Sequence, residues 1–114
     1  MRRLVELAAK ERRRAVGLIS GTSADGIDAA LVEITGGAAA RYEMLACATS
    51  ALAADLRQDI FSLFAADASL DDLCLINAAL GEAFAAAVLE VVAQAGVAPA
   101  DIDLVGSHGQ TVRH

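Results

Sequence analysis

The stretch Ile19–Ile34, ISGTSADGIDAALVEI, decides the fold of this chain. An apolar run at 15–19 gives way to small, polar and acidic residues, and alternating apolar residues resume at 28–34. Both runs have the pattern of β-strands. The interruption is longer than the two residues that suffice to reverse a chain, so we predict two strands joined by an enlarged loop, Gly21–Asp28.

The following segments extend this strand pair into a three-stranded meander. Gly36-Gly37 forms a turn, and a weaker, alanine-rich strand follows at 42–49. Three consecutive strands joined by short loops favour an antiparallel arrangement. The period then changes to that of a helix at 54–66.

A second helix is the clearest element of the sequence. Ser69 can cap it, acidic residues occupy its first turn, and Gly96 offers a left-handed stop. Gly81 lies in its interior and predicts a close approach of another backbone. A fourth strand at 102–106 then precedes a polar group. The order of elements differs from a doubly wound Rossmann unit, and we predict an α/β fold whose mixed sheet has an N-terminal three-stranded meander and flanking helices.

Composition and charge exclude several classes of protein. The 114 residues suffice for one domain, with a net charge of −6 and a mean hydropathy of +0.50. Basic residues concentrate in the first fourteen positions, so we expect a basic extension at 1–14 and one domain at 15–114. The acidic remainder argues against nucleic-acid binding.

The chain shows no pattern of a secreted or membrane protein. Charges at Glu6 and Lys10 interrupt the start, where a signal peptide needs an apolar run. Apolar stretches bounded by Glu82 and Glu90 fall short of the about 20 residues of a membrane span. Cys47 and Cys74 are far apart and form no CxxC pair, so we expect free, buried thiols in a reducing cytoplasm and no nucleophile.

The enlarged loop has chemistry suited to phosphate. It has Walker A glycine spacing, but Ile27-Asp28 replace the Lys-Ser/Thr pair and a strand follows, so it is not a P-loop. Backbone N–H groups in such a tip can bind an anion, and a carboxylate beside them can hold hydrated magnesium on a nucleotide triphosphate. A plain hairpin turn remains the alternative.

The polar group Ser107-His-Gly-Gln-Thr111 follows the fourth strand, where ligands commonly bind in open α/β sheets. We expect His108 and Gln110 to hydrogen-bond a sugar or to orient a neighbouring loop, with a purely structural histidine as the alternative. A hydrolase using Ser107 and His108 is a weaker possibility, because adjacent side chains on a strand end point apart.

Three motifs together resemble the N-terminal part of anhydro-N-acetylmuramic acid kinases. Residues 17–28 match that family's "GLMSGTSxDGID" loop, 80–88 its "LGExFAxAV"-like helix, and 106–114 its "GSHGQTVRH" segment, in the same order. The resemblance implies an actin, sugar kinase and Hsp70-like fold. Ile19 and Ala24 depart mildly from the family pattern.

The resemblance also implies which residues bind ATP, Mg²⁺ and the sugar. The ATP-binding loop would comprise Gly21, Thr22, Ser23, Ala24, Asp25, Gly26, Ile27 and Asp28, with Asp25 at Mg²⁺, and the sugar side would comprise Ser107, His108, Gln110 and Thr111.

The activity implied by the resemblance is phosphorylation of 1,6-anhydro-N-acetylmuramic acid by ATP in cell-wall recycling, while water opens the anhydro ring. The family's base opens an Asp-Thr-Gly-Pro-Gly-Asn motif, which this sequence lacks. We therefore expect 15–114 to be part of the first lobe of a cytoplasmic kinase that is inactive alone, with a homodimer as the candidate assembly of the complete protein. A non-catalytic nucleotide-binding or interaction module is the alternative.

Overall fold

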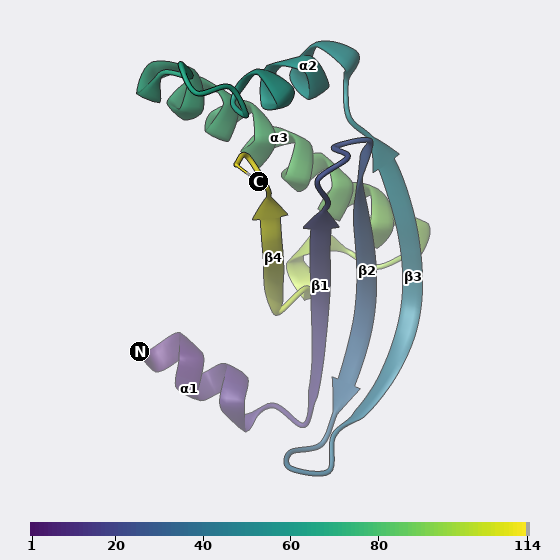
Figure 1. Cartoon of the computed structure of the whole chain (residues 1–114). Helices are drawn as coiled ribbons and strands as arrows, with labels where there is room; N and C mark the ends of the chain where they lie inside the picture. Colours follow the sequence, from purple (N-terminus) through teal and green to yellow (C-terminus); the bar gives the residue numbers. More distant parts are fainter. Residues whose placement is uncertain (114) are drawn as a thin grey trace.

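The fold is a four-stranded sheet with the helices at 54–62 and 70–94 on one face (Figure 1). This computed structural model describes residues 1–113, so the final residue of the last predicted motif, His114, lies outside the described residues. The elements in chain order are α1 (Arg2–Ala9), β1 (Arg12–Ser20), β2 (Gly26–Thr35), β3 (Arg41–Ala51), α2 (Ala54–Ser62), α3 (Leu70–Gln94), the 3₁₀ turn η1 (Pro99–Asp101) and β4 (Leu104–Gln110).

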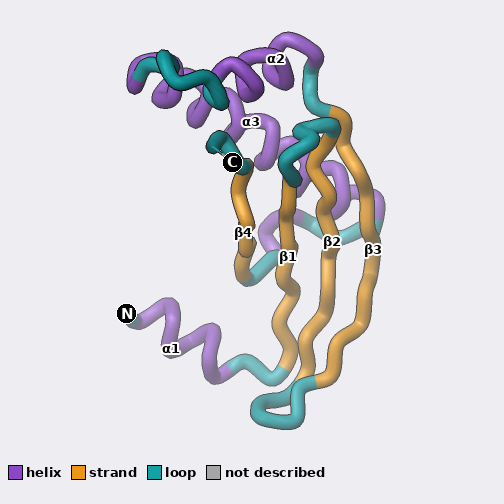
Figure 2. Tube along the Cα trace, in the orientation of Figure 1, coloured by secondary structure: helices purple, strands orange, loops and turns teal. Residues whose placement is uncertain are grey.

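The sheet has the strand order β3-β2-β1-β4, visible in Figure 2. β1 pairs antiparallel with β2, and β2 pairs antiparallel with β3, which confirms the predicted meander. β4 returns to lie parallel to β1, with Gly17 paired to Gly106. The sheet is therefore mixed, as predicted, and the carboxyl ends of β1 and β4 meet at the same edge.

The hydrophobic core lies between the sheet and α3. Alternation along β2 turns Ile27, Ala29 and Leu31 inward. α3 crosses this face and buries Ile76, Leu80, Ala87, Val91 and Val92. Its predicted ends are confirmed, because the Ser69 hydroxyl accepts a hydrogen bond from the Asp72 N–H at 3.1 Å and Gly96 has φ +69°.

β1 begins three residues earlier than predicted. Arg12 and Arg14 lie in the strand and pair with Glu33 of β2 at 3.4 and 3.3 Å, which extends the ladder into the basic run. Ahead of β1, α1 lies away from the sheet (Figure 1). Arg13 holds its end, with Nε donating to the Leu7 carbonyl oxygen at 2.6 Å.

α3 is also longer and more apolar than the sequence-based argument allowed. It has 25 residues, and its most apolar window has a mean hydropathy of 1.7, so length and composition alone would let it cross a membrane. Glu82 and Glu90 lie within this helix, and the core helix of a soluble protein can have the same length and composition. Its buried side chains nevertheless pack against the sheet, as those of a core helix do.

Two further predictions were wrong. Cys47 and Cys74 are both exposed, because Cys47 faces outward on the edge strand β3 and Cys74 lies on the solvent side of α3. Gly81 makes no close backbone contact, since a Cβ built there has no heavy atom within 4 Å. It instead lines an apolar groove between α3 and β4.

Candidate functional site

The predicted phosphate loop connects β1 to β2 at the edge where β1 and β4 end. It borders a hollow of about 390 Å³, which is lined by Ile19, Gly21, Ser23, Asp25, Gly26, Asp28 and Thr49. Most of the lining therefore comes from the loop itself, and Thr49 is contributed by β3. The loop presents its backbone and both of its carboxylates to the same concave surface.

The two loop glycines occupy different environments. A Cβ at Gly21 would meet no heavy atom within 4 Å, whereas one at Gly26 would lie 2.9 Å from the Ser50 carbonyl oxygen. Gly26 is thus required by packing of β2 against β3. Gly21 has no such requirement within the described chain, and its open surroundings leave room for a ligand to approach the backbone.

Two residues anchor the loop from beneath. Ala24 and Ile27 are both buried in the hydrophobic core. Ala24 has a φ of +48°, unusual for a residue with a Cβ, and its N–H donates to the Gly21 carbonyl oxygen at 3.1 Å to close a tight turn. With their side chains facing the core, these two residues can offer a ligand only their backbone.

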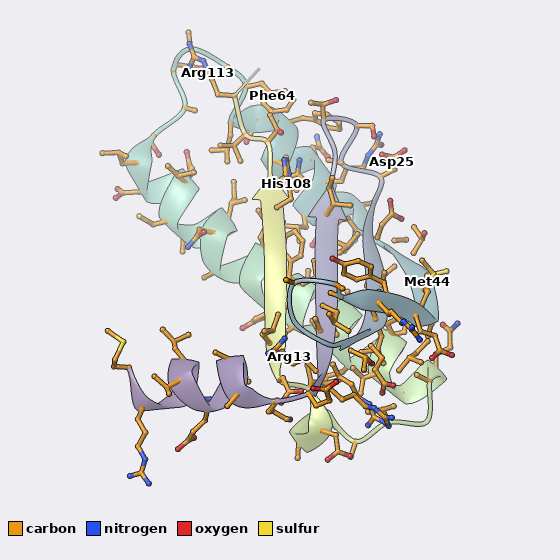
Figure 3. The ribbon with its side chains drawn as sticks, turned by 90° about the horizontal axis from the view of Figure 1, so that it is seen from below. Arg13, Asp25, Met44, Phe64, His108 and Arg113 are labelled. Carbon is orange, nitrogen blue, oxygen red and sulfur yellow. The ribbon has the colours of Figure 1, made fainter. Side chains whose placement is uncertain are left out.

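Asp25 is exposed and lines the hollow, and Figure 3 shows where it lies at the loop end of the sheet. The Ser23 hydroxyl and the Asp25 backbone N–H hold its pKa below the usual value, with a lesser contribution from the positive charge of Arg57, and desolvation opposes them. Arg57 also donates to the Ser23 carbonyl oxygen at 3.3 Å. The carboxylate is therefore ionised at neutral pH.

Asp28 supplies the second carboxylate and is held by β3. Its Oδ1 accepts a hydrogen bond from the Thr49 hydroxyl at 2.6 Å. Neither Thr49 nor Arg57 was predicted from sequence, because they lie on other elements and no spacing pattern links them to the loop. Pairing across the β2–β3 ladder brings Thr49 opposite Asp28.

The carboxylates of Asp25 and Asp28 fit magnesium bound mainly through water and phosphate. Mg²⁺ usually takes one or two protein carboxylates and keeps several waters. Within residues 1–113 no group of three or more His, Cys, Asp or Glu side chains gathers as a metal cage. This donor set suits a phosphate-bridging ion better than a structural metal.

The second predicted segment lies within β4, not after it, which corrects the sequence-based boundary. Its residues 107–110 complete the strand, and Thr111 follows directly. Ser107 and Gln110 line an apolar groove of about 740 Å³ beside α3, whereas strand alternation places His108 on the opposite face of the sheet. Figure 3 shows His108 near the end of β4, at the same end of the sheet as Asp25.

Gln110 touches the phosphate loop directly. Its Nε2 donates to the Gly21 carbonyl oxygen at 2.9 Å, and its Oε1 accepts from the buried Ser20 hydroxyl. The two predicted segments, far apart in sequence, are therefore in contact, because β1 and β4 are parallel neighbours. This contact joins Gly21, which the family resemblance assigned to the nucleotide, and Gln110, which it assigned to the sugar.

Comparison with known proteins identifies one family. A sequence model described as anhydro-N-acetylmuramic acid kinase matches residues 13–114. Curated proteins with that name are 46% identical over all of this chain in Caldanaerobacter subterraneus subsp. tengcongensis, and 45% and 43% identical over 87% of it in Xylella fastidiosa and Bordetella pertussis. The chain spans only 29%, 26% and 26% of these relatives, respectively.

Proposed function

The chain belongs to the anhydro-N-acetylmuramic acid kinase family, and we propose that it carries the loop that holds the phosphates of ATP in such an enzyme. One observation supports this assignment above the others. The loop combines an unobstructed glycine backbone at Gly21 with two carboxylates on the same hollow. A plain hairpin turn needs neither feature.

Each part of the loop would have a distinct role in binding ATP. The backbone N–H groups of Thr22 and Ser23, which make no hydrogen bond within residues 1–113, would donate to phosphate oxygens, which can approach because Gly21 has no side chain. Asp25, kept ionised by its neighbours, would hold water molecules around Mg²⁺. Asp28, held by Thr49, would be the second carboxylate beside the ion. Bound magnesium would neutralise charge on the transferred phosphoryl group.

We propose that the complete protein phosphorylates the sugar in the family name, anhydro-N-acetylmuramic acid. The γ-phosphoryl group of ATP passes to the 6-oxygen of 1,6-anhydro-N-acetylmuramic acid, and water adds at the anomeric carbon as the anhydro bridge opens. The products are ADP and N-acetylmuramic acid 6-phosphate. Residues 1–114 would supply nucleotide contacts, and a base outside them would activate the water. Because the proposed reaction uses ATP, we propose that the protein acts in the cytoplasm.

His108 is our candidate for a sugar contact. It lies near the phosphate loop at the end of β4, but on the face of the sheet opposite Ser107. An imidazole there could exchange hydrogen bonds with hydroxyl or amide groups of the sugar. Thr111, just past the strand, would extend the same polar edge.

The proposal is tested with the complete coding sequence extended to the length of the relatives. Purified protein, Mg·ATP and the anhydro sugar should yield ADP and the 6-phosphate in equal amounts, measured by coupled assay and mass spectrometry. Asp25→Asn should raise the magnesium concentration needed for half-maximal rate. Asp101→Asn, which changes an exposed carboxylate before β4, is the matched control.

Two outcomes would contradict the proposal. ATP binding without sugar phosphorylation would favour a non-catalytic nucleotide-binding module. Absence of ATP binding in the complete, folded protein would remove the function assigned to the loop.

A further inference from the structure

A bulge near the end of β4 sets the direction of Gln110. Ile19 of β1 faces two residues of β4, and pairing resumes between Ser20 and Gln110. The extra residue is accommodated by Gly109, whose φ is +81°, and the Gly109 N–H donates to the Ser107 hydroxyl at 3.1 Å. Since side chains alternate along a strand, one extra residue reverses the face that the following side chain takes.

The bulge aims the Gln110 carboxamide at the phosphate loop. Nε2 donates to the carbonyl oxygens of Gly21 and Thr111, at 2.9 and 3.0 Å. Oε1 accepts from the Ser20 hydroxyl, which also lies 2.9 Å from the Gly26 carbonyl oxygen. If the amide were flipped, Oε1 would lie next to the carbonyl oxygens of Gly21 and Thr111 with no hydrogen to share. The surrounding groups therefore fix the positions of Nε2 and Oε1.

These hydrogen bonds fix one peptide unit of the loop. The Gly21 carbonyl oxygen accepts from both Gln110 and the Ala24 N–H, which occupies both of its lone pairs. In a planar trans peptide, the N–H of Thr22 points opposite to that carbonyl. No hydrogen bond from the Thr22 N–H is formed within residues 1–113. This donor is therefore oriented by Gln110 and left for a ligand.

We propose that Gln110 is a positioning residue of the phosphate loop: from β4 it orients the Gly21–Thr22 peptide so that the Thr22 N–H meets a phosphate oxygen of the nucleotide. The inference rests on the function proposed for the loop. Of the two roles that the sequence left open for Gln110, contact with the sugar or orientation of a neighbouring loop, it selects the second and identifies the nucleotide loop as the one oriented. The bulge at Gly109 is the structural device that makes this support possible.

Gln110→Glu in the complete protein is the most direct test. Glutamate keeps the size of the side chain and the acceptor for Ser20, but its carboxylate cannot donate to Gly21. We expect the Kd of Mg·ATP, measured calorimetrically, to rise about 10-fold, since a hydrogen bond is lost and a charge faces a carbonyl oxygen. The KM for the sugar at saturating ATP should not change.

Gln94→Glu is the matched control. Gln94 Nε2 also donates to a backbone carbonyl oxygen, that of Cys47 at 3.1 Å, but it does so at the end of α3 rather than at the loop. This variant should bind ATP as the wild type does. If it weakens ATP binding as much as Gln110→Glu, the effect is one of general stability and the positioning role is overturned.

The remaining outcomes separate this inference from the proposed function. If Gly21→Val abolishes ATP binding while Gln110→Glu binds ATP normally, the loop keeps its function and the positioning role is wrong. A raised sugar KM with unchanged ATP affinity in Gln110→Glu would make Gln110 a sugar contact instead. Should that variant fail to fold, Ser20→Ala removes the partner of Oε1 and should weaken ATP binding about 3-fold, and unchanged affinity would refute the role. A wild type that binds no ATP refutes the proposed function itself.

Discussion

Adding one methyl group should destabilise the protein at Gly26 and leave its stability nearly unchanged at Gly21. In Gly26→Ala the new Cβ would lie 2.9 Å from the Ser50 carbonyl oxygen and 3.2 Å from Thr49 Cγ2. Cβ atoms do not approach a backbone oxygen this closely, so the paired ends of β2 and β3 must separate by several tenths of an ångström. Overpacking of this kind costs about 1–3 kcal/mol of unfolding free energy.

Gly21→Ala provides the comparison in the same loop. Its Cβ would meet no heavy atom within 4 Å, and we expect the unfolding free energy to change by about 0.5 kcal/mol or less. Urea titrations of both variants and the wild type, followed by circular dichroism, measure the difference. The two variants should also differ in ATP affinity, because Gly21→Ala places its methyl group where phosphate would approach. Equal stability of Gly26→Ala and Gly21→Ala would refute the account of loop packing.

Three other predictions address single side chains. Asp25→Asn should lower turnover at limiting magnesium and be largely rescued by excess magnesium, because it removes one charge and keeps the shape; a rate loss independent of magnesium would contradict this. His108→Ala should lower kcat/KM for the sugar about 2- to 10-fold while ATP binding measured without sugar is unchanged, and a fall in melting temperature alone would make the residue structural. Asp103 accepts from the Lys10 ammonium and the Arg14 N–H, which lower its pKa, so its stabilisation exists above the unfolded pKa of about 3.9 and is lost as pH falls through the folded value. Asp103→Asn should therefore reduce stability by about 1 kcal/mol at pH 7 and by progressively less below about pH 4, and a pH-independent difference in thermal unfolding would contradict the assignment.

Local patterns predicted the elements well where periodicity and caps were strong. The strand pair around the loop and the helix from Ser69 to Gly96 follow from alternation, an N-terminal cap and a left-handed stop, and both are confirmed. The start of β1 was missed, because Arg12 and Arg14 look like a solvated run until Glu33 is placed across the ladder.

Contacts between distant segments could not be read from the sequence in the same way. The bulge at Gly109 changes the face of the sheet on which the Gln110 side chain lies. Nothing in the local sequence pattern distinguishes this bulge from an ordinary strand end. Burial of Cys47 was predicted from residue type alone, which fails on an edge strand. Gly81 was read as a packing glycine, but the space beside it is a groove.

Amide hydrogen exchange measured with and without Mg·ATP shows whether the loop at residues 21–28 binds the nucleotide, because it reports on individual backbone segments of the complete protein. We expect ATP to slow exchange in peptides covering the loop at residues 21–28. The β2–β3 hairpin at 36–40, at the opposite end of the sheet, should be unaffected. Calorimetric ATP binding with no protection of residues 21–28 would contradict the account, because the nucleotide would then be held elsewhere.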